Sequence, residues 1–167
     1  YQHSCIKWIG IDQINLILFY CLSLGLEIII ATARWLDLAK QVTDKLKLTA
    51  PIITCSGAQV YDPMTSQDLA DHRLPTDIVD LIYPLIDSLD CIATATYDSH
   101  TFLSGFPEPA NSQNMGAVKW VNSLSEAAAE PARMLTVQGT QALNRIKSIL
   151  APEIDRVSVA DSIGPSG

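Results

Sequence analysis

The stretch that decides the fold is 26-LEIIIATARWLDLAKQ-41. Its first half is mostly apolar, with an unbroken run of isoleucines at 28, 29 and 30, which is typical of a strand covered on both faces of a parallel sheet. Its second half, from position 35, repeats apolar residues at helical spacing. Thr32 and Arg34, on either side of Ala33, lie where the two halves meet. The stretch therefore predicts a buried strand, a short polar loop and a helix, in direct succession.

The same alternation extends to both sides of this stretch. A short apolar run before it ends on a carboxylate, and an apolar segment between the two runs fits a helix whose C-cap is Gly25. A third short strand follows the helix. The order strand, helix, strand, helix, strand is typical of a doubly wound α/β fold. The predicted ranges are 6–12, 14–24, 26–32, 35–46 and 51–55.

The pattern of elements changes after residue 57, where hairpin-like strand pairs replace the regular alternation. We predict helices at 74–89, 118–130 and 140–150, and strands at 58–61, 91–97, 101–103, 133–138 and 156–160. The chain is thus expected to hold a Rossmann-like parallel-sheet fragment at 1–57, an α+β domain at 58–163 and a tail at 164–167.

Composition excludes some classes of partner. The 167 residues carry a net charge of −7 and have no basic run, which argues against binding to nucleic acid. The apolar segment 16–31 is interrupted by Ser23, Gly25 and Glu27, so we expect no membrane span. The four cysteines are far apart and form no C-x-x-C pair, which favours buried, reduced thiols in a cytoplasmic protein over a zinc site.

Three strand ends offer polar groups. In an open α/β sheet, ligands bind beyond the carboxyl ends of the strands. Asp12, Thr32 and Ser56 each follow a predicted strand, so we expect them at one edge of the sheet. Thr32 also lies just before a helix, where free backbone N–H groups favour an anion, and this predicts a phosphate site. Alternatively, Thr32 only caps the helix and Arg34 is a solvated flank.

Three segments resemble one known family. IKWIGID at 6–12, SLGLEIIIATAR at 23–34 and PIITCSGAQVYD at 51–62 are similar to the N-terminal half of haloacid dehalogenase (HAD) superfamily phosphatases of the Cof type. The resemblance implies a HAD-type core with an inserted α+β cap domain. It also implies a magnesium-dependent phosphohydrolase that acts on small phosphorylated metabolites through a phosphoaspartyl intermediate.

The resemblance assigns a role to several residues. Asp12 matches the nucleophile, which is also a magnesium ligand in such a site. The phosphoryl group would be bound by the Thr32 hydroxyl, the Ala33 backbone N–H and Arg34. The turn that leads into the cap, and toward the substrate, corresponds to Ser56, Gly57 and Ala58.

The sequence also departs from the family pattern. The family has a second aspartate two positions after the nucleophile, as general acid and base, and Ile14 stands there in this chain. No later segment supplies the family's Lys and metal-binding acids. We therefore expect impaired activity; the alternative is a non-catalytic truncated remnant that serves as an anion-binding or interaction module. The uncovered strand 6–12 is also expected to favour self-association.

Overall fold

A computed structural model of the chain describes residues 20–89, 91–97, 100–105, 117–127 and 130–160. The chain divides into two compact units, residues 1–69 and 70–167. The predicted strand 6–12, with Asp12, lies outside the described residues. The domain bounds predicted from the sequence, 57/58 and 163/164, stay a prediction, because compactness alone does not tell where a core ends and a cap begins.

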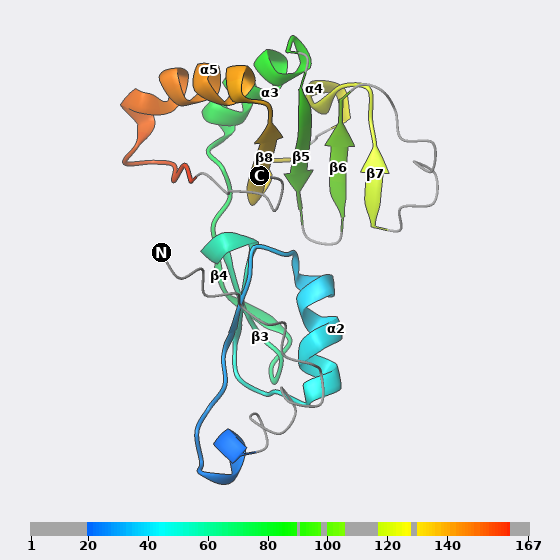
Figure 1. Ribbon diagram of the computed structural model, residues 1–167, viewed down its shortest axis with the longest axis vertical. Coiled ribbons are helices and arrows are strands. Elements are labelled where there is room, and N and C mark those ends of the chain that lie inside the picture. Colours follow the sequence, from blue (N-terminus) through cyan, green and yellow to red (C-terminus); the bar gives the residue numbers. More distant parts are fainter. Residues whose placement is uncertain (1–19, 90, 98–99, 106–116, 128–129, 161–167) are drawn as a thin grey trace, which may run out of the picture. The chain divides into compact units, whose positions relative to one another are not determined.

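The first unit contains a four-stranded sheet with the order β1-β2-β3-β4 (Figure 1). β1 and β2 are parallel, as the sequence predicts, and β3 returns antiparallel to β2. Helix α2 packs against β2. The elements are β1 (Ile30–Ala31), α2 (Leu36–Leu46), β2 (Ile52–Thr54), β3 (Gln59–Asp62) and β4 (Gln67–Asp71).

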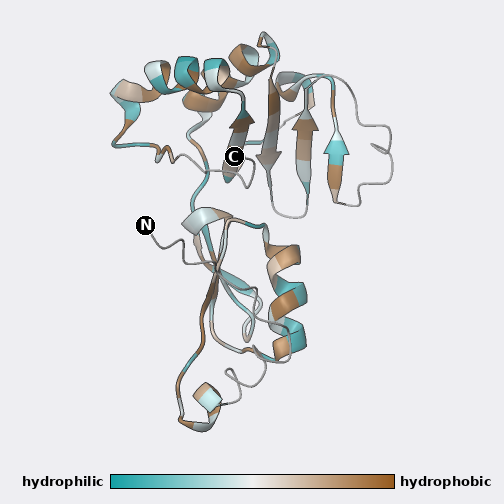
Figure 2. Cartoon of the chain, in the orientation of Figure 1, coloured by the Kyte–Doolittle hydropathy of each residue, from teal (hydrophilic) through white to brown (hydrophobic). Residues whose placement is uncertain are grey.

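Helix α2 confirms the helical spacing read from the sequence. Ala39 and Thr43, one turn apart, are buried, and apolar and polar residues occupy different sides of the helix in Figure 2. Before it, Gly25 closes a helical turn with φ +73°, so the predicted C-cap is confirmed. A residue with a Cβ would be strained in this conformation.

The burial expected for the apolar run at 26–32 is wrong for the described residues. Only Ile30 and Ala31 form a strand, and Leu26 and Ile29 are 53% and 54% exposed. A strand is covered on both faces only when elements pack on each of them. β1 lies at the end of the strand order, so no described strand pairs with its other side. The run therefore has the composition of a central strand, but only one neighbouring strand, β2, pairs with it among the described residues.

The second unit holds a separate four-stranded sheet with the order β7-β6-β5-β8 (Figure 1). Its strands are antiparallel except for the parallel pair of β6 and β7. The elements are α3 (Thr76–Asp87), β5 (Ile92–Thr96), β6 (Thr101–Ser104), β7 (Val118–Trp120), α4 (Leu124–Ala127), β8 (Met134–Gln138) and α5 (Thr140–Leu150).

One hydrophobic core joins this second sheet to its helices. Ala93 and Ala95, which alternate along β5, are buried together with residues of α3 and α5. Within α3 the buried isoleucines recur at 78, 82 and 86, and within α5 the buried residues recur at 142, 146 and 150. These spacings of four put each apolar stripe on one helix face. Both helices therefore cover the same face of the sheet.

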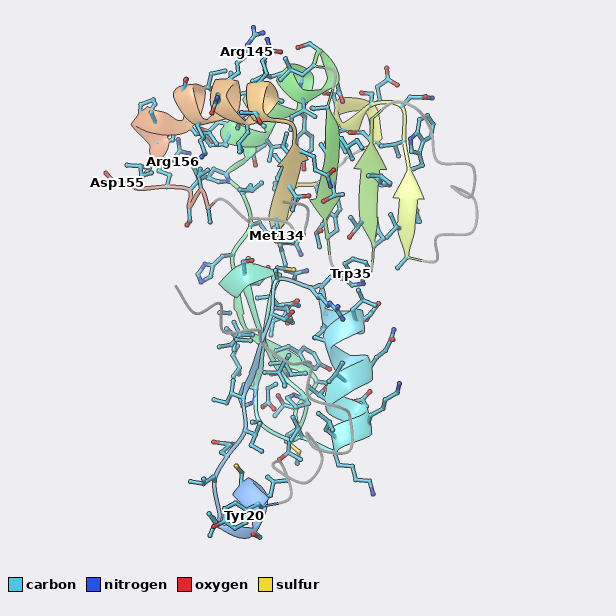
Figure 3. All side chains as sticks on the ribbon, viewed as in Figure 1. Tyr20, Trp35, Met134, Arg145, Asp155 and Arg156 are labelled. Atoms are coloured by element: carbon cyan, nitrogen blue, oxygen red, sulfur yellow. The ribbon has the colours of Figure 1, made fainter. Side chains whose placement is uncertain are left out.

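Two predicted elements of the second half are wrong. Residues 118–130 are not one helix: 118–120 form β7, and α4 begins only at Leu124. The predicted strand at 156–160 is not a strand. Arg156, labelled in Figure 3, instead donates to both carboxylate oxygens of Asp77 at 2.7 and 2.8 Å. This ion pair joins Arg156 to the first turn of α3.

The broad prediction of a mixed α/β fold is confirmed. Strand β4 is an addition to the elements predicted from the sequence. Among the described residues, no helix has the length and apolar character needed to cross a membrane.

Candidate functional site

The loop after β1 holds the predicted anion-binding residues Thr32, Ala33 and Arg34. The Thr32 N–H continues the parallel ladder by donating to the Ile53 carbonyl at 2.9 Å. The Arg34 N–H donates to the Thr32 hydroxyl oxygen at 3.2 Å. Because this bond uses a lone pair of the hydroxyl, its proton stays available to an acceptor such as a phosphate oxygen. The side chains of Ala33 and Arg34 are exposed.

The capping alternative for Thr32 is wrong. Helix α2 begins at Leu36, its N-cap residue is Trp35, and no side chain caps it. The Thr32 hydroxyl accepts from Arg34, which precedes the helix, and so it stabilises the loop and not the first turn of α2. The first N–H groups of α2 consequently have no side-chain acceptor at the N-cap.

The turn after β2 holds the second predicted group, Ser56, Gly57 and Ala58. Cys55 and Ser56 both have left-handed backbone angles, with φ of 49° and 56°. This conformation costs roughly 1–2 kcal/mol for a residue with a Cβ. Such strain persists only where surrounding contacts enforce it, and it is typical of functional sites.

Two backbone hydrogen bonds join this turn to the loop after β1. The Cys55 N–H donates to the Arg34 carbonyl at 3.0 Å, and the Ser56 N–H donates to the Thr32 carbonyl at 3.1 Å. The structure therefore brings together two of the three strand ends that the sequence assigns to one edge. The third, Asp12, lies outside the described residues, and its position stays a prediction.

A chain of polar side chains runs from buried Thr54 and Gln59 to exposed Asp68 beside the turn, and sequence reasoning missed it. The Thr54 hydroxyl donates to Gln59 Oε1 at 2.8 Å, and Gln59 Nε2 donates to Asp68 Oδ1 at 2.9 Å. Thr54 and Gln59 are 0% and 3% exposed. They are also register partners of β2 and β3. A polar residue in a short strand gives no signal by itself; only the pairing of the strands makes Gln59 a partner of Thr54.

One further polar atom of the first unit is unusual. The indole Nε1 of Trp35, the residue labelled at the start of α2 in Figure 3, is buried and has no hydrogen-bond acceptor among the residues that the structure describes. Such orphan donors are rare in folded proteins.

Several charged groups of residues 70–167, a unit that includes the last residue of β4, Asp71, form ion pairs with one another. Arg133, with its side chain 1% exposed, donates to Asp71 at 2.7 Å, and Arg73 lies 3.2 Å from the same carboxylate. Burial acts to raise the pKa of Asp71, but the hydrogen bond from Arg133 and the charge of both arginines outweigh it and hold that pKa below its usual range. These groups stabilise the unit.

Comparison with known proteins identifies the family. A profile of haloacid dehalogenase-like hydrolases matches residues 11–162, and the chain belongs to this family. The family prediction made from the sequence is confirmed. No curated protein sequence matches the chain.

Solved structures of the family share the fold. A haloacid dehalogenase-like hydrolase from Bacteroides thetaiotaomicron aligns with a TM-score of 0.72 at 15% identity, over 97% of this chain and 64% of its own. A protein from Thermotoga maritima aligns with a TM-score of 0.66 at 24% identity, over 89% and 58%. A sugar phosphatase of HAD subclass IIB aligns with a TM-score of 0.62 at 15% identity, over 78% and 52%. The chain thus spans between half and two thirds of the length of these relatives.

Proposed function

We propose that the chain is a phosphohydrolase of the HAD type that binds the phosphoryl group of a small phosphorylated metabolite on the Thr32–Arg34 loop, with Asp12 as nucleophile. One observation carries the proposal. The loop after β1 and the strained turn after β2 are hydrogen-bonded together at the carboxyl ends of two parallel strands. That place is where open α/β sheets bind ligands.

The groups gathered there are donors. The Thr32 hydroxyl has its oxygen fixed by Arg34 N–H and its proton available, and Arg34 adds a guanidinium that forms no ion pair within the described part of the chain. An anion with several acceptor oxygens satisfies such a set, and a guanidinium can bind a phosphoryl group through two N–H groups. The sugar phosphatase among the solved relatives agrees with a phosphorylated, polar substrate.

The proposed reaction has two steps. A carboxylate oxygen of Asp12 attacks phosphorus, the ester P–O bond breaks, and the leaving oxygen takes up a proton; water then cleaves the aspartyl phosphate. Ile14 has no proton to give where the family has its general acid, so the leaving oxygen must take it from water. Loss of a general acid or base typically costs 10²–10⁴-fold in rate, and we therefore propose that turnover is impaired.

Magnesium enters this proposal through the family alone. When bound in such a site, it would neutralise charge on the phosphoryl oxygens. Among the described residues, no group of three or more His, Cys, Asp or Glu side chains could hold a metal ion. The residues described therefore do not fit the ion by themselves, and the argument for phosphate binding rests on Thr32 and Arg34.

A cytoplasmic location belongs to the same proposal. Within the described part of the chain no disulfide joins Cys21, Cys55 and Cys91, and the latter two are buried. Buried cysteines outside disulfides are typical of proteins from reducing compartments.

The test is a titration of the full chain with inorganic phosphate, followed through the backbone amide resonances of Ala33 and Arg34. We expect saturable shifts of both amides. Thr32→Val should weaken binding roughly tenfold by removing the hydroxyl donor, whereas Thr32→Ser should keep it. A titration that leaves both amides unmoved would overturn the proposed phosphate site.

Hydrolysis of an aryl phosphate with magnesium tests the catalytic part separately. We expect turnover near background, because Ile14 replaces the acid. Fast turnover that Asp12→Asn abolishes would show that the acid function is supplied elsewhere and would overturn the impairment. Phosphate binding with no effect of Asp12→Asn on any hydrolysis would favour the anion-binding module.

A further inference from the structure

We infer that Gln59 is a positioning residue for the phosphate loop: it locks the strained turn to which Thr32 and Arg34 are fastened. The inference rests on the proposed function, since it assigns to Gln59 a role in phosphate affinity. It concerns a side chain that forms hydrogen bonds to Thr54 and Asp68 and acts on the loop through the turn.

The orientation of the Gln59 amide is fixed by its two neighbours. Asp68 can only accept when ionised, so the group that meets its Oδ1 at 2.9 Å must be the amide nitrogen. The amide oxygen then faces Thr54, whose hydroxyl donates to it at 2.8 Å. Reversal of the amide would place two acceptors against each other at Asp68. The chain of bonds therefore has one direction only.

Thr54 and Gln59 flank the turn on its two sides. Thr54 is the last residue of β2 and Gln59 is the first residue of β3, and the two are register partners. The four residues 55–58 connect them. Within this turn Ala58 N–H donates to the Cys55 carbonyl at 3.2 Å, and Cys55 and Ser56 hold their left-handed angles. Such strain persists only where surrounding contacts over-determine the conformation. The buried Thr54–Gln59 hydrogen bond adds a side-chain contact to the backbone pairing of these two residues at the ends of the turn.

The turn at 55–58 is hydrogen-bonded to the phosphate loop at 32–34. The N–H groups of Cys55 and Ser56 donate to the carbonyls of Arg34 and Thr32 at 3.0 and 3.1 Å. Relaxation of either left-handed residue would rotate these N–H groups away from their acceptors. The loop would then lose two of its fixed points, and the Thr32 hydroxyl and the loop amides would no longer converge on one anion.

The experiment measures phosphate affinity in three variants of the full chain, two with a substitution at position 59 and one with substitutions at positions 59 and 68. Each variant is measured below its own unfolding temperature. Gln59→Met removes both hydrogen bonds at similar volume. Gln59→Glu keeps an acceptor for Thr54 but removes the donor to Asp68 and adds a like charge. The double variant Gln59→Glu with Asp68→Asn restores a complementary donor and acceptor. Gln67→Met, an exposed glutamine of the same hairpin, is the matched control.

We expect the phosphate dissociation constant to rise about tenfold for Gln59→Met and Gln59→Glu, and to return toward the native value in the double variant. Amide hydrogen exchange of Cys55 and Ser56 should accelerate in the same two single variants. Gln67→Met should change neither quantity. A purely structural role would lower the unfolding temperature and leave the affinity of the folded chain unchanged.

Native phosphate affinity in Gln59→Met would overturn the inference while the proposed function stands. Absence of phosphate binding in the native chain would overturn the proposed function, and the role of Gln59 in phosphate affinity with it. The exchange rates of Cys55 and Ser56 would then still tell whether Gln59 locks the turn.

Discussion

At the scale of single residues, His100 gives the second unit a pH dependence. Its ring stacks on Tyr97 at 5.1 Å between centroids and meets the edge of Phe102 at 4.8 Å. Burial and the nearby charge of Lys119 lower the pKa of His100, against a smaller opposing effect of Glu130. A lowered pKa means that the folded state binds fewer protons than the unfolded state, so the free energy of unfolding rises with pH.

We therefore predict that this stabilisation is present above the ordinary histidine pKa of about 6.5 and is lost as the pH falls through the folded pKa. His100→Gln should flatten the fall in unfolding temperature between about pH 7 and pH 5, as measured by thermal denaturation at several pH values. His72→Gln, at an exposed position of the same unit, is the control and should keep the native slope. An unchanged slope in His100→Gln would contradict the assignment.

At the scale of elements, Asp87 explains why α4 begins where it does. Its carboxylate accepts from the backbone N–H groups of Leu124 and Ser125 at 2.8 and 3.0 Å, and from two serine hydroxyls. Burial acts to raise the pKa of Asp87, but these hydrogen bonds outweigh it and lower that pKa. A carboxylate from the end of α3 thus caps a neighbouring helix of four residues.

Asp87→Ala should destabilise the second unit by about 1–2 kcal/mol, because the free N–H groups of α4 lose their acceptors. Chemical denaturation, together with hydrogen exchange of Leu124 and Ser125, measures this. Asp80→Ala, at an exposed position of the same helix α3, should change stability by less than about 0.5 kcal/mol. Equal effects of the two substitutions would show that α4 does not depend on the cap from Asp87.

At the scale of the whole molecule, the two units differ in how well they bury apolar side chains. The first unit leaves several of them exposed, whereas the second unit has a buried hydrophobic core. Tyr20, Leu26 and Ile29 are more than half exposed, and Tyr20 is labelled in Figure 3. β1 lies at the end of its sheet among the strands that the structure describes, while the core of the second unit is continuous across its sheet and helices. Exposed apolar patches beside an unpaired strand edge favour association.

We expect the chain to self-associate through this part of the first unit. Sedimentation velocity should show a concentration-dependent increase in mass, and Ile29→Lys should reduce it. Leu81→Lys, which adds the same charge at an exposed leucine of α3, should not. Amides of β8 should be better protected from exchange than those of β1. A native chain that stays monomeric at every concentration would contradict the expectation.

The sequence by itself determined the local elements that carry the candidate site. Helical spacing placed α2, Gly25 marked a left-handed C-cap, and polar residues after apolar runs marked the loop at Thr32 and the turn at Ser56. These features depend on neighbours within a few positions, so residue type and spacing suffice to predict them.

Only the tertiary structure decided how these pieces meet. The register of β1 on β2 brings the carbonyls of Arg34 and Thr32 to the N–H groups of Cys55 and Ser56. That Gln59 meets Thr54 follows from the antiparallel return of β3. The same holds for α4, whose start is set by a carboxylate 37 positions earlier in the chain. Contacts of this kind depend on strand register and packing, which bring together residues whose spacing along the chain carries no signal of their proximity.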